Sequence, residues 1–170
     1  HISLHKDTCL MFTQTPYANH MTGLILQELS ADTALQANSL ELRPGQEQFE
    51  TPVTYENADA SLDHAKTWGR VIIRDGEVLG FVRAYFDSSH PDEVLRCCVW
   101  RVSVAASAQG QGVGRFAIDA VTEEARAQGF TTLSAVWSGD EEGPGEFFQH
   151  LGFSKTGVTE YGDTIGSLTL

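Results

Sequence analysis

Seven residues in the middle of the chain, Gln109–Arg115, have the composition of a phosphate-binding loop. Glycine stands at positions 110, 112 and 114, where the missing Cβ lets the backbone turn tightly and leaves its N–H groups accessible. Apolar residues then recur at helical spacing as far as Ala125, and the first acid of this expected helix is Asp119. Because a helix amino terminus without carboxylates attracts anions, the segment predicts a site for the oxygens of a pyrophosphate group.

Comparison with known glycine-loop patterns reduces the number of ligands that the loop could bind. Gly112–Ala117 fits the dinucleotide pattern G-x-G-x-x-A, but Ala105–Ala108 separate it from the preceding strand and too little chain follows for a dinucleotide-binding unit. A P-loop is excluded, since no Gly-Lys-Ser/Thr follows at the required spacing. Two interpretations stay open. One is a turn without a ligand, and the other is the acyl-CoA loop Gln/Arg-x-x-Gly-x-Gly/Ala, matched by Gln109, Gly112 and Gly114.

Together with a second motif, the loop resembles that of the GNAT superfamily of acyl-CoA-dependent N-acetyltransferases. Phe147–Phe153 is similar to the late helix-to-strand element of this family, and the resemblance runs from about Leu24 to Leu170. It implies an α/β fold with a mixed, mostly antiparallel sheet flanked by helices, and acetyl-CoA as co-substrate without a metal. It also implies that the backbone of Val102, Ser103 and Val104 pairs with the pantetheine arm. The residues implied to hold the pyrophosphate are Gln109, Gly110, Gln111, Gly112, Val113, Gly114 and Arg115.

Attack of an amine on a thioester requires a neutral amine and a stabilised oxyanion. A primary amine with a pKa near 10.4 is neutral to only about 1 part in 2,500 at pH 7, so a general base is useful. Many family members carry a glutamate on the central strand, but the comparable stretch here, Trp100–Val102, has no acid. We expect a backbone N–H near Val102 to stabilise the oxyanion. The remaining candidates for the base are Glu47, Glu50, Glu93 and His150.

The thiolate that leaves acetyl-CoA needs a proton. Family members commonly have a tyrosine in the late motif that protonates this sulfur. This chain has Phe148 there, and we expect its ring to lie beside the thioester sulfur. A thiol pKa near 8.5 makes the thiolate a tolerable leaving group at neutral pH. Tyr161 or Tyr85 would supply the proton if the fold brought either hydroxyl close.

Two further resemblances concern the residues that would bind the amine acceptor. Arg43–Glu50 resembles the bacterial spermine/spermidine (diamine) N-acetyltransferase branch, in which this region forms one wall of the acceptor site; Glu47 and Glu50 are therefore candidates for binding a substrate ammonium. A solvated acidic helix face accounts for both glutamates equally well. Trp100 and Arg101 also resemble that branch and are expected to contact the acceptor, the alternative being a core tryptophan beside a structural ion pair.

Composition restricts the partners. The net charge of −12, from 23 acids against 11 Lys and Arg, argues against nucleic-acid binding and would attract a polycationic substrate, although net acidity also simply keeps proteins soluble. Cys97 and Cys98 are adjacent and are expected to be small apolar residues rather than a disulfide framework. Neither a transmembrane run nor a signal peptide is recognised, so we expect a cytoplasmic protein without a membrane partner, and a homodimer is one expected assembly.

These observations give an acetyl-CoA-dependent N-acetyltransferase acting on a small polycationic amine such as a polyamine as the expected function. The alternatives are acetylation of a peptide or protein amine or of an aminoglycoside-like drug. A third alternative, motivated by Phe148 and the missing strand glutamate, is a CoA-binding regulatory domain with little turnover.

The expected elements form one domain over residues 21–170, and residues 1–20 are expected to be a vector-derived or non-conforming extension. An Asp-Gly turn at 75–76 predicts a hairpin. The expected strands are Leu24–Leu29, Trp68–Arg74, Glu77–Phe86, Val94–Val104, Thr131–Trp137, Phe153–Val158 and Ile165–Leu170. The expected helices are Ser30–Leu40, Asn57–Lys66, Gly112–Gln128 and Glu146–His150, the first with Ser30 as its N-cap.

Overall fold

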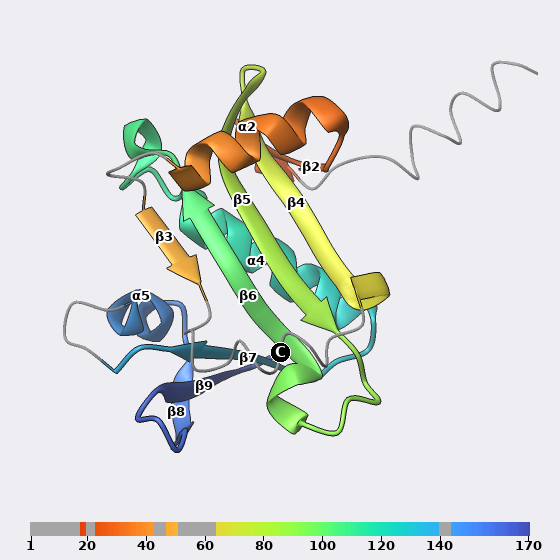
Figure 1. Cartoon of the computed structure of the whole chain (residues 1–170), viewed down its shortest axis with the longest axis vertical. Helices are drawn as coiled ribbons and strands as arrows, with labels where there is room; N and C mark the ends of the chain where they lie inside the picture. The colour runs from red at the N-terminus through yellow and green to blue at the C-terminus, as the bar shows by residue number, and fades with distance from the viewer. Residues whose placement is uncertain (1–17, 20–22, 43–46, 51–63, 140–143) are drawn as a thin grey trace, which may run out of the picture.

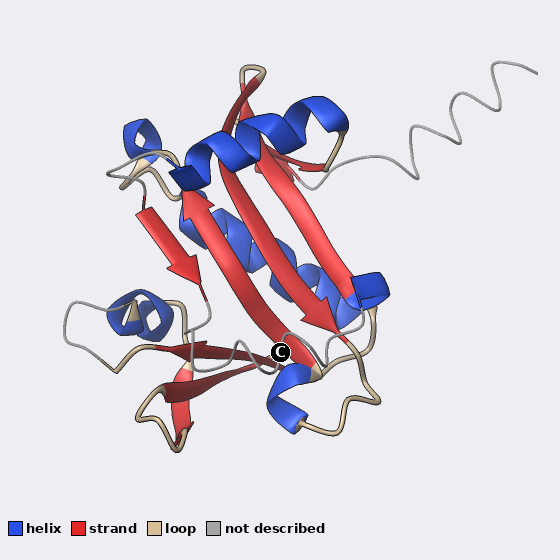
Figure 2. Cartoon of the chain, viewed as in Figure 1, coloured by secondary structure: helices blue, strands red, loops and turns tan. Residues whose placement is uncertain are grey.

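The computed structural model describes residues 18–19, 23–42, 47–50, 64–139 and 144–170. Nine strands of these residues form one mixed sheet in the order β1-β2-β4-β5-β6-β7-β9-β8, with β3 paired to β6 beside this path (Figures 1 and 2). The strands are β1 Ala18–Asn19, β2 Leu24–Glu28, β3 Glu47–Glu50, β4 Thr67–Arg74, β5 Glu77–Phe86, β6 Cys97–Val104, β7 Thr132–Trp137, β8 Ser154–Val158 and β9 Thr164–Thr169. The helices are α2 Ala31–Leu42, α4 Val113–Ala127 and α5 Gly145–His150, with short 3₁₀ turns η2 His64–Lys66, η3 Glu93–Leu95 and η4 Ala106–Ala108.

The sheet is mostly antiparallel, as expected. Only the β6–β7 pair is parallel among the pairs of the described strands. The two strands are connected through α4, since parallel strands need a crossover connection, usually a helix. The predicted fold class, a mixed α/β sheet flanked by helices, is therefore confirmed.

The β4–β5 hairpin is the longest paired element and confirms the prediction from Asp-Gly. Asp75 and Gly76 have φ angles of 52° and 77°, which is the left-handed pair that a two-residue type I′ turn requires. Asp tolerates this conformation better than most residues, and Gly adopts it without strain. The closing hairpin of β8 and β9 is also present as predicted.

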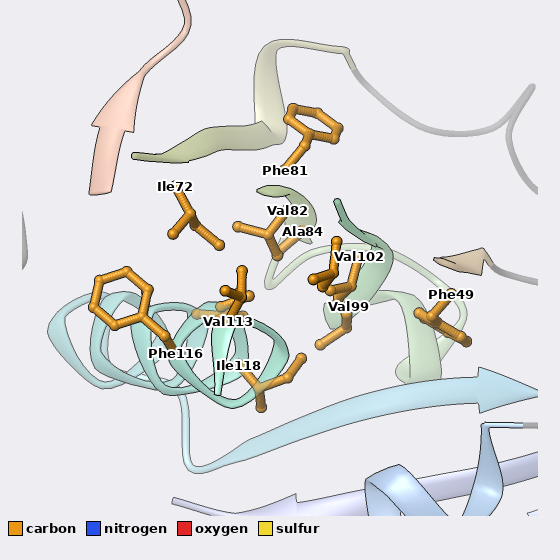
Figure 3. Close-up of a cluster of buried hydrophobic side chains, with 14 of the residues drawn as sticks. Phe49, Ile72, Phe81, Val82, Ala84, Val99, Val102, Val113, Phe116 and Ile118 are labelled. Carbon is orange, nitrogen blue, oxygen red and sulfur yellow. The ribbon is translucent and has the colours of Figure 1, made fainter. Parts of the chain in front are cut away.

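Helix α4 lies behind the sheet in Figure 1 and carries most of the core on that side. Its buried face includes Val113, Phe116 and Ile118, and Figure 3 shows Val113 and Phe116 on the side of Ile72 and Val82 of the sheet. The helix ends in a Schellman motif: the Phe130 N–H donates to Ala125 O, and Gly129 has a φ of 88°. Gly129 thus caps the carboxyl end of the helix.

Helix α2 crosses in front of the same strands. Its N-cap is Ser30, as predicted: the Ser30 hydroxyl accepts from the Thr33 N–H at 3.2 Å, and the Thr33 hydroxyl accepts from the Ser30 N–H at 2.7 Å. The helix extends two residues beyond the predicted end. α2 and α4 thus cover opposite faces of β4, β5 and β6.

Two further expectations are wrong. The central strand begins at Cys97 instead of Val94, because the Asp92 carboxylate accepts from the Val94 N–H and holds residues 93–95 in a 3₁₀ turn. The acidic helix face considered for Glu47 and Glu50 is also wrong, since residues 47–50 form strand β3.

Other expectations fall wholly or partly outside the described residues. Most of the expected helix Asn57–Lys66 does so, and its last three residues form the 3₁₀ turn η2. The interpretation of residues 1–20 is likewise outside, apart from the short strand β1. In the part of the chain that the structure describes, no helix is long and apolar enough to cross a membrane.

Candidate active site

Strands β6 and β7 meet at one end and separate toward the other. The described residues pair them at Cys98 and Ser134, near the amino end of β6. β7 then turns across the view in Figure 1, while β6 continues toward the glycine loop. The carboxyl half of β6, the loop and the start of α4 therefore surround one region.

The three glycines of the loop have different structural roles, two in the backbone turn and one in helix packing. Gly110 and Gly112 have φ angles of 75° and 84°, and a Cβ on either would have no neighbour within 4 Å. These two glycines are needed for the turn, and their outer side is open. Gly114 lies inside α4, and a Cβ there would come within 3.1 Å of the Phe147 ring. It is therefore a packing glycine that lets α5 approach α4.

The start of α4 fits a phosphate group. The helix begins its hydrogen bonding with the Phe116 N–H donating to Gly112 O, so the N–H groups of Val113, Gly114 and Arg115 precede the first intrahelical bond. Its first turn has no acid, and its N-cap, Gly112, makes no side-chain capping bond. A pyrophosphate thus finds N–H donors, the positive end of a 15-residue helix and an open approach.

Arg74, the last residue of β4, contacts the glycine loop and is a residue that the sequence analysis did not identify. Its guanidinium donates to the Gln111 side-chain oxygen at 2.7 Å, and the Gln111 amide donates to Ser107 O at 3.1 Å. The contact spans 37 residues of sequence, so no local spacing signals it. Arg74 adds a positive charge beside the loop.

We expect Arg74→Gln to weaken acetyl-CoA binding about two- to fivefold at low salt, because an exposed ion pair contributes up to about 1 kcal/mol. Glutamine keeps an N–H donor for Gln111 but removes the charge. Titration calorimetry at two salt concentrations measures the change, and the difference should shrink at high salt. Arg126→Gln, near the other end of α4, is the control for net charge. Identical affinities for Arg74→Gln and the wild type at low salt would contradict the assignment.

Strand β6 is paired on both edges along its carboxyl half. Val102, Ser103 and Val104 lie opposite Val82, Phe81 and Gly80 of β5, and on the other edge they lie opposite residues of β3. Phe49 of β3 stands opposite Val102. A pantetheine arm that pairs with this backbone, as the resemblance implies, must take the place of β3.

Phe148 lies in an aromatic cluster beside this edge. Its side chain has no exposed surface, and its ring centroid lies 4.7 Å from that of Phe49 and 5.0 Å from that of Trp137. Phe147 and Phe153 close the remaining sides, each 5.2 Å away. A contact between Phe148 and a thioester would need one of these neighbours to move, so the expected position beside the sulfur stays a prediction.

The candidates for proton transfer are spread over the fold. Glu93 lies in η3, before the amino end of β6, and the five residue steps from Cys97 to Val102 alone span about 17 Å. Glu93 is therefore not brought to Val102. His150 is exposed on the last turn of α5, 4.0 Å from Glu146. The backbones of Glu47 and Glu50 lie along β6, opposite Val104 and Arg101.

The two tyrosines considered as proton donors, Tyr161 and Tyr85, do not lie together at the carboxyl half of β6. Tyr161 is 60% exposed in the turn between β8 and β9, and the negative charge of Glu160 raises the pKa of its hydroxyl. Tyr85 is buried, and its hydroxyl donates to the Asp87 carboxylate at 3.3 Å. Tyr85 is paired with Cys98, at the amino end of β6, so its hydroxyl is committed at the other end of the strand from Val104.

The two described cysteines, Cys97 and Cys98, do not have the properties of nucleophiles. Burial raises the pKa of the Cys97 thiol to about 12 and that of the Cys98 thiol further, so both are protonated at neutral pH. Both side chains are buried, as expected of small apolar residues. Within the described ranges, no group of three or more His, Cys, Asp and Glu side chains could hold a metal ion.

A β-bulge in β6 sets the direction of its half-buried residues. Arg101 lies opposite Arg83, and Val99 lies opposite Ala84, so Trp100 is the extra residue. The bulge lets Val99 and Val102 both face α4, although they are three residues apart (Figure 3). Trp100 and Arg101 are both half-buried.

Comparisons with known proteins agree with this geometry. Residues 33–153 match the model of the acetyltransferase (GNAT) family. The chain is 30% identical to N-acetyltransferase family 8 member 2 of Rattus norvegicus over 94 residues, which are 55% of this chain and 41% of the relative. The chain spans about half the length of the curated relatives it matches.

Solved structures share the fold. A ribosomal-protein-S5-alanine acetyltransferase from Vibrio fischeri has a TM-score of 0.64 at 14% identity, covering 91% of this chain and 96% of that one. An aminoglycoside 6′-N-acetyltransferase complexed with coenzyme A has a TM-score of 0.61 at 15% identity, covering 85% and 96%. At such identities the likeness concerns the fold alone.

Proposed function

The chain belongs to the acetyltransferase (GNAT) family, and we propose that it transfers an acetyl group from acetyl-CoA to a primary amine. The observation that carries the proposal is the loop at residues 109–115. Two left-handed glycines there precede the amino end of α4, whose first turn has no acid, close to the carboxyl end of the central strand.

Acetyl-CoA supplies an activated acyl thioester, and the residues of this chain bind and orient it. In the proposal, the N–H groups of Val113, Gly114 and Arg115 hold the pyrophosphate, and Arg74 adds a charge beside them. The backbone of Val102–Val104 aligns the arm, and an N–H at Val102 donates to the carbonyl oxygen as its charge develops. The acceptor approaches in the region where β6 and β7 separate.

We further propose a class of amine as the acceptor. A polyamine is favoured by the net charge of −12 and by the placement of Glu47 and Glu50 along β6. Peptide amines and aminoglycosides are the other candidates, because similar folds include a ribosomal-protein acetyltransferase and an aminoglycoside acetyltransferase. The cytoplasmic location and the homodimer stay predictions.

Release of free thiol from acetyl-CoA tests the proposal. We expect amine-dependent release above the hydrolysis background for at least one of spermidine, an amino acid, an alanine-terminated peptide and an aminoglycoside. Mass spectrometry should show one added acetyl group on the amine. Tight binding of acetyl-CoA without release for any of these acceptors would contradict the proposal and favour a CoA-binding domain.

A further inference from the structure

A pocket of about 230 Å³ lies at the amino end of β6, the end of this strand opposite to the glycine loop (Figure 1). It is lined by the segment before β6, by the connection from α4 to β7, and by Ser134 of β7, which pairs with Cys98. Pockets of about 300–1,000 Å³ hold drug-sized ligands, so this one suits a smaller molecule. We propose that it binds a free α-amino acid with an apolar side chain, independently of the acetyl transfer proposed above.

The pocket holds one acidic and one basic side chain that do not pair with each other. Glu93 begins the 3₁₀ turn η3 and Arg96 is its C-cap, and side chains three residues apart on such a turn lie on one side of it. Both line the pocket, yet neither belongs to an ion pair among the described residues. Opposite charges held apart across a small pocket fit a ligand that carries both, with its carboxylate at Arg96 and its ammonium at Glu93.

Arg96 is held in place by the backbone before it. Its Nε–H donates to His90 O at 2.8 Å, and the buried His90 ring is itself fixed, since its Nδ1 accepts from the Asp92 N–H at 3.0 Å. Within the described ranges, the terminal nitrogens of the guanidinium have no hydrogen-bond or ion-pair partner. A half-buried guanidinium that is anchored at Nε and free at both terminal nitrogens is positioned to bind the two oxygens of a carboxylate.

The rest of the wall supplies hydroxyl groups and one aromatic ring. Four hydroxyls line the pocket without a hydrogen-bond partner in the part of the chain that the structure describes: those of Ser88, Thr131, Thr132 and Ser134. Such groups donate to a carboxylate and accept from an ammonium. Phe130 is half-buried and stacks on Phe86, with ring centroids 5.8 Å apart. Its ring, which also lines the pocket, offers an apolar surface for an aliphatic side chain.

A ligand with a single charge fits this pocket less well. The net charge of the chain is −12, so the field of the protein repels a free anion, and Arg96 repels a free cation. A zwitterion is neutral overall and meets neither penalty. Two neighbouring acids have other partners: Asp87 accepts from the Ser89 hydroxyl, and Asp92 accepts from the Val94 N–H. Glu93 is therefore the acid that we assign to the ammonium.

Titration of the ¹⁵N-labelled protein with L-leucine tests the inference without acetyl-CoA. We expect saturable NMR shifts of the Phe130 and Thr132 amides, a Kd of about 1 mM or tighter, and no shift of the Gly112 amide. 4-Methylpentanoate is leucine without the amine, and 3-methylbutylamine is leucine without the carboxylate. Each should bind about tenfold or more weakly than leucine, because hydrogen bonds to charged groups are strong.

Two variants assign the two charges of the ligand. Glu93 is exposed, so Glu93→Lys should fold; it should weaken leucine binding about tenfold or more and strengthen binding of 4-methylpentanoate. Glu146→Lys makes the same charge change on exposed α5 and should keep the wild-type affinities. Arg96→Gln should weaken binding of leucine and 4-methylpentanoate but not of 3-methylbutylamine, which distinguishes a lost carboxylate contact from a folding defect.

Three results would overturn the inference. They are no saturable binding of leucine, shifts confined to the glycine loop, and an unchanged affinity for leucine in both Glu93→Lys and Arg96→Gln. Acetyl transfer is measured by thiol release, so a failure of the amino-acid site leaves that proposal intact, and a protein without turnover can still bind leucine here.

Discussion

Gly112→Asp should weaken acetyl-CoA binding by at least about tenfold while the protein stays folded. Gly112 caps α4 with a φ of 84°, and a Cβ there would have no neighbour within 4 Å, so the aspartate side chain meets no clash and costs only the strain of a left-handed φ, which Asp tolerates better than most residues. Its carboxylate would stand where the pyrophosphate oxygens are expected. Two like charges 4 Å apart at an effective dielectric constant near 20 repel by about 4 kcal/mol, and about 1.4 kcal/mol already changes Kd tenfold.

The structure offers a matched control for this variant. Gly129 has a φ of 88°, and a Cβ there would also have no neighbour within 4 Å, but it follows the opposite end of α4. Gly129→Asp therefore adds the same charge and a similar backbone strain about 25 Å away. Calorimetric titration with acetyl-CoA should give nearly the wild-type Kd for Gly129→Asp. Equal Kd values for both aspartate variants would remove the loop from the binding site.

Phe148→Ala should lower the free energy of unfolding by about 3–5 kcal/mol, the usual cost of truncating a buried phenylalanine. The ring is fully buried and contacts four other aromatic rings from β3, β7, α5 and the segment after α5. The neighbours come from separate elements and cannot all collapse into the cavity. Urea unfolding followed by circular dichroism measures the change.

Leu35→Ala is the comparison for Phe148→Ala. Leu35 is 72% exposed on α2, and alanine favours helices. The free energy of unfolding of Leu35→Ala should therefore stay within about 0.5 kcal/mol of the wild-type value. A Phe148→Ala variant as stable as Leu35→Ala would mean that the aromatic cluster is loosely packed. Phe148 would then be available to a ligand, as the sequence suggested.

The parts of the fold that the sequence predicts well have strong local signals. Asp75-Gly76 fixes a turn because few residues adopt two successive positive φ angles. Ser30 and Gly129 mark helix ends through hydrogen bonds that reach only a few residues. The loop at 109–115 belongs to the same class, since glycine conformation and helix capping are both local.

The parts that the sequence does not predict depend on distant neighbours. Glycines at 114, 145 and 166 look like turn residues, but a Cβ on each would approach an aromatic ring: Phe147 for the first, and Trp137 for the other two. Pairing of β3 with β6 and the opposition of Arg83 and Arg101 are set by strand register. The bulge at Trp100 shifts that register by one residue, so simple alternation misplaces the side chains around it.

The β3–β6 pairing has a consequence for ligand affinity, given the proposed binding of the pantetheine arm to the same edge. One strand edge cannot bond two partners at once, so β3 and the arm compete for it. The apparent affinity is then the intrinsic affinity multiplied by the fraction of molecules in which β3 is detached. Because Phe49 is buried against Phe148, that fraction depends on an aromatic contact outside the glycine loop. Substitutions at Phe49 thus tune co-substrate occupancy from within the chain, without touching any residue that binds phosphate.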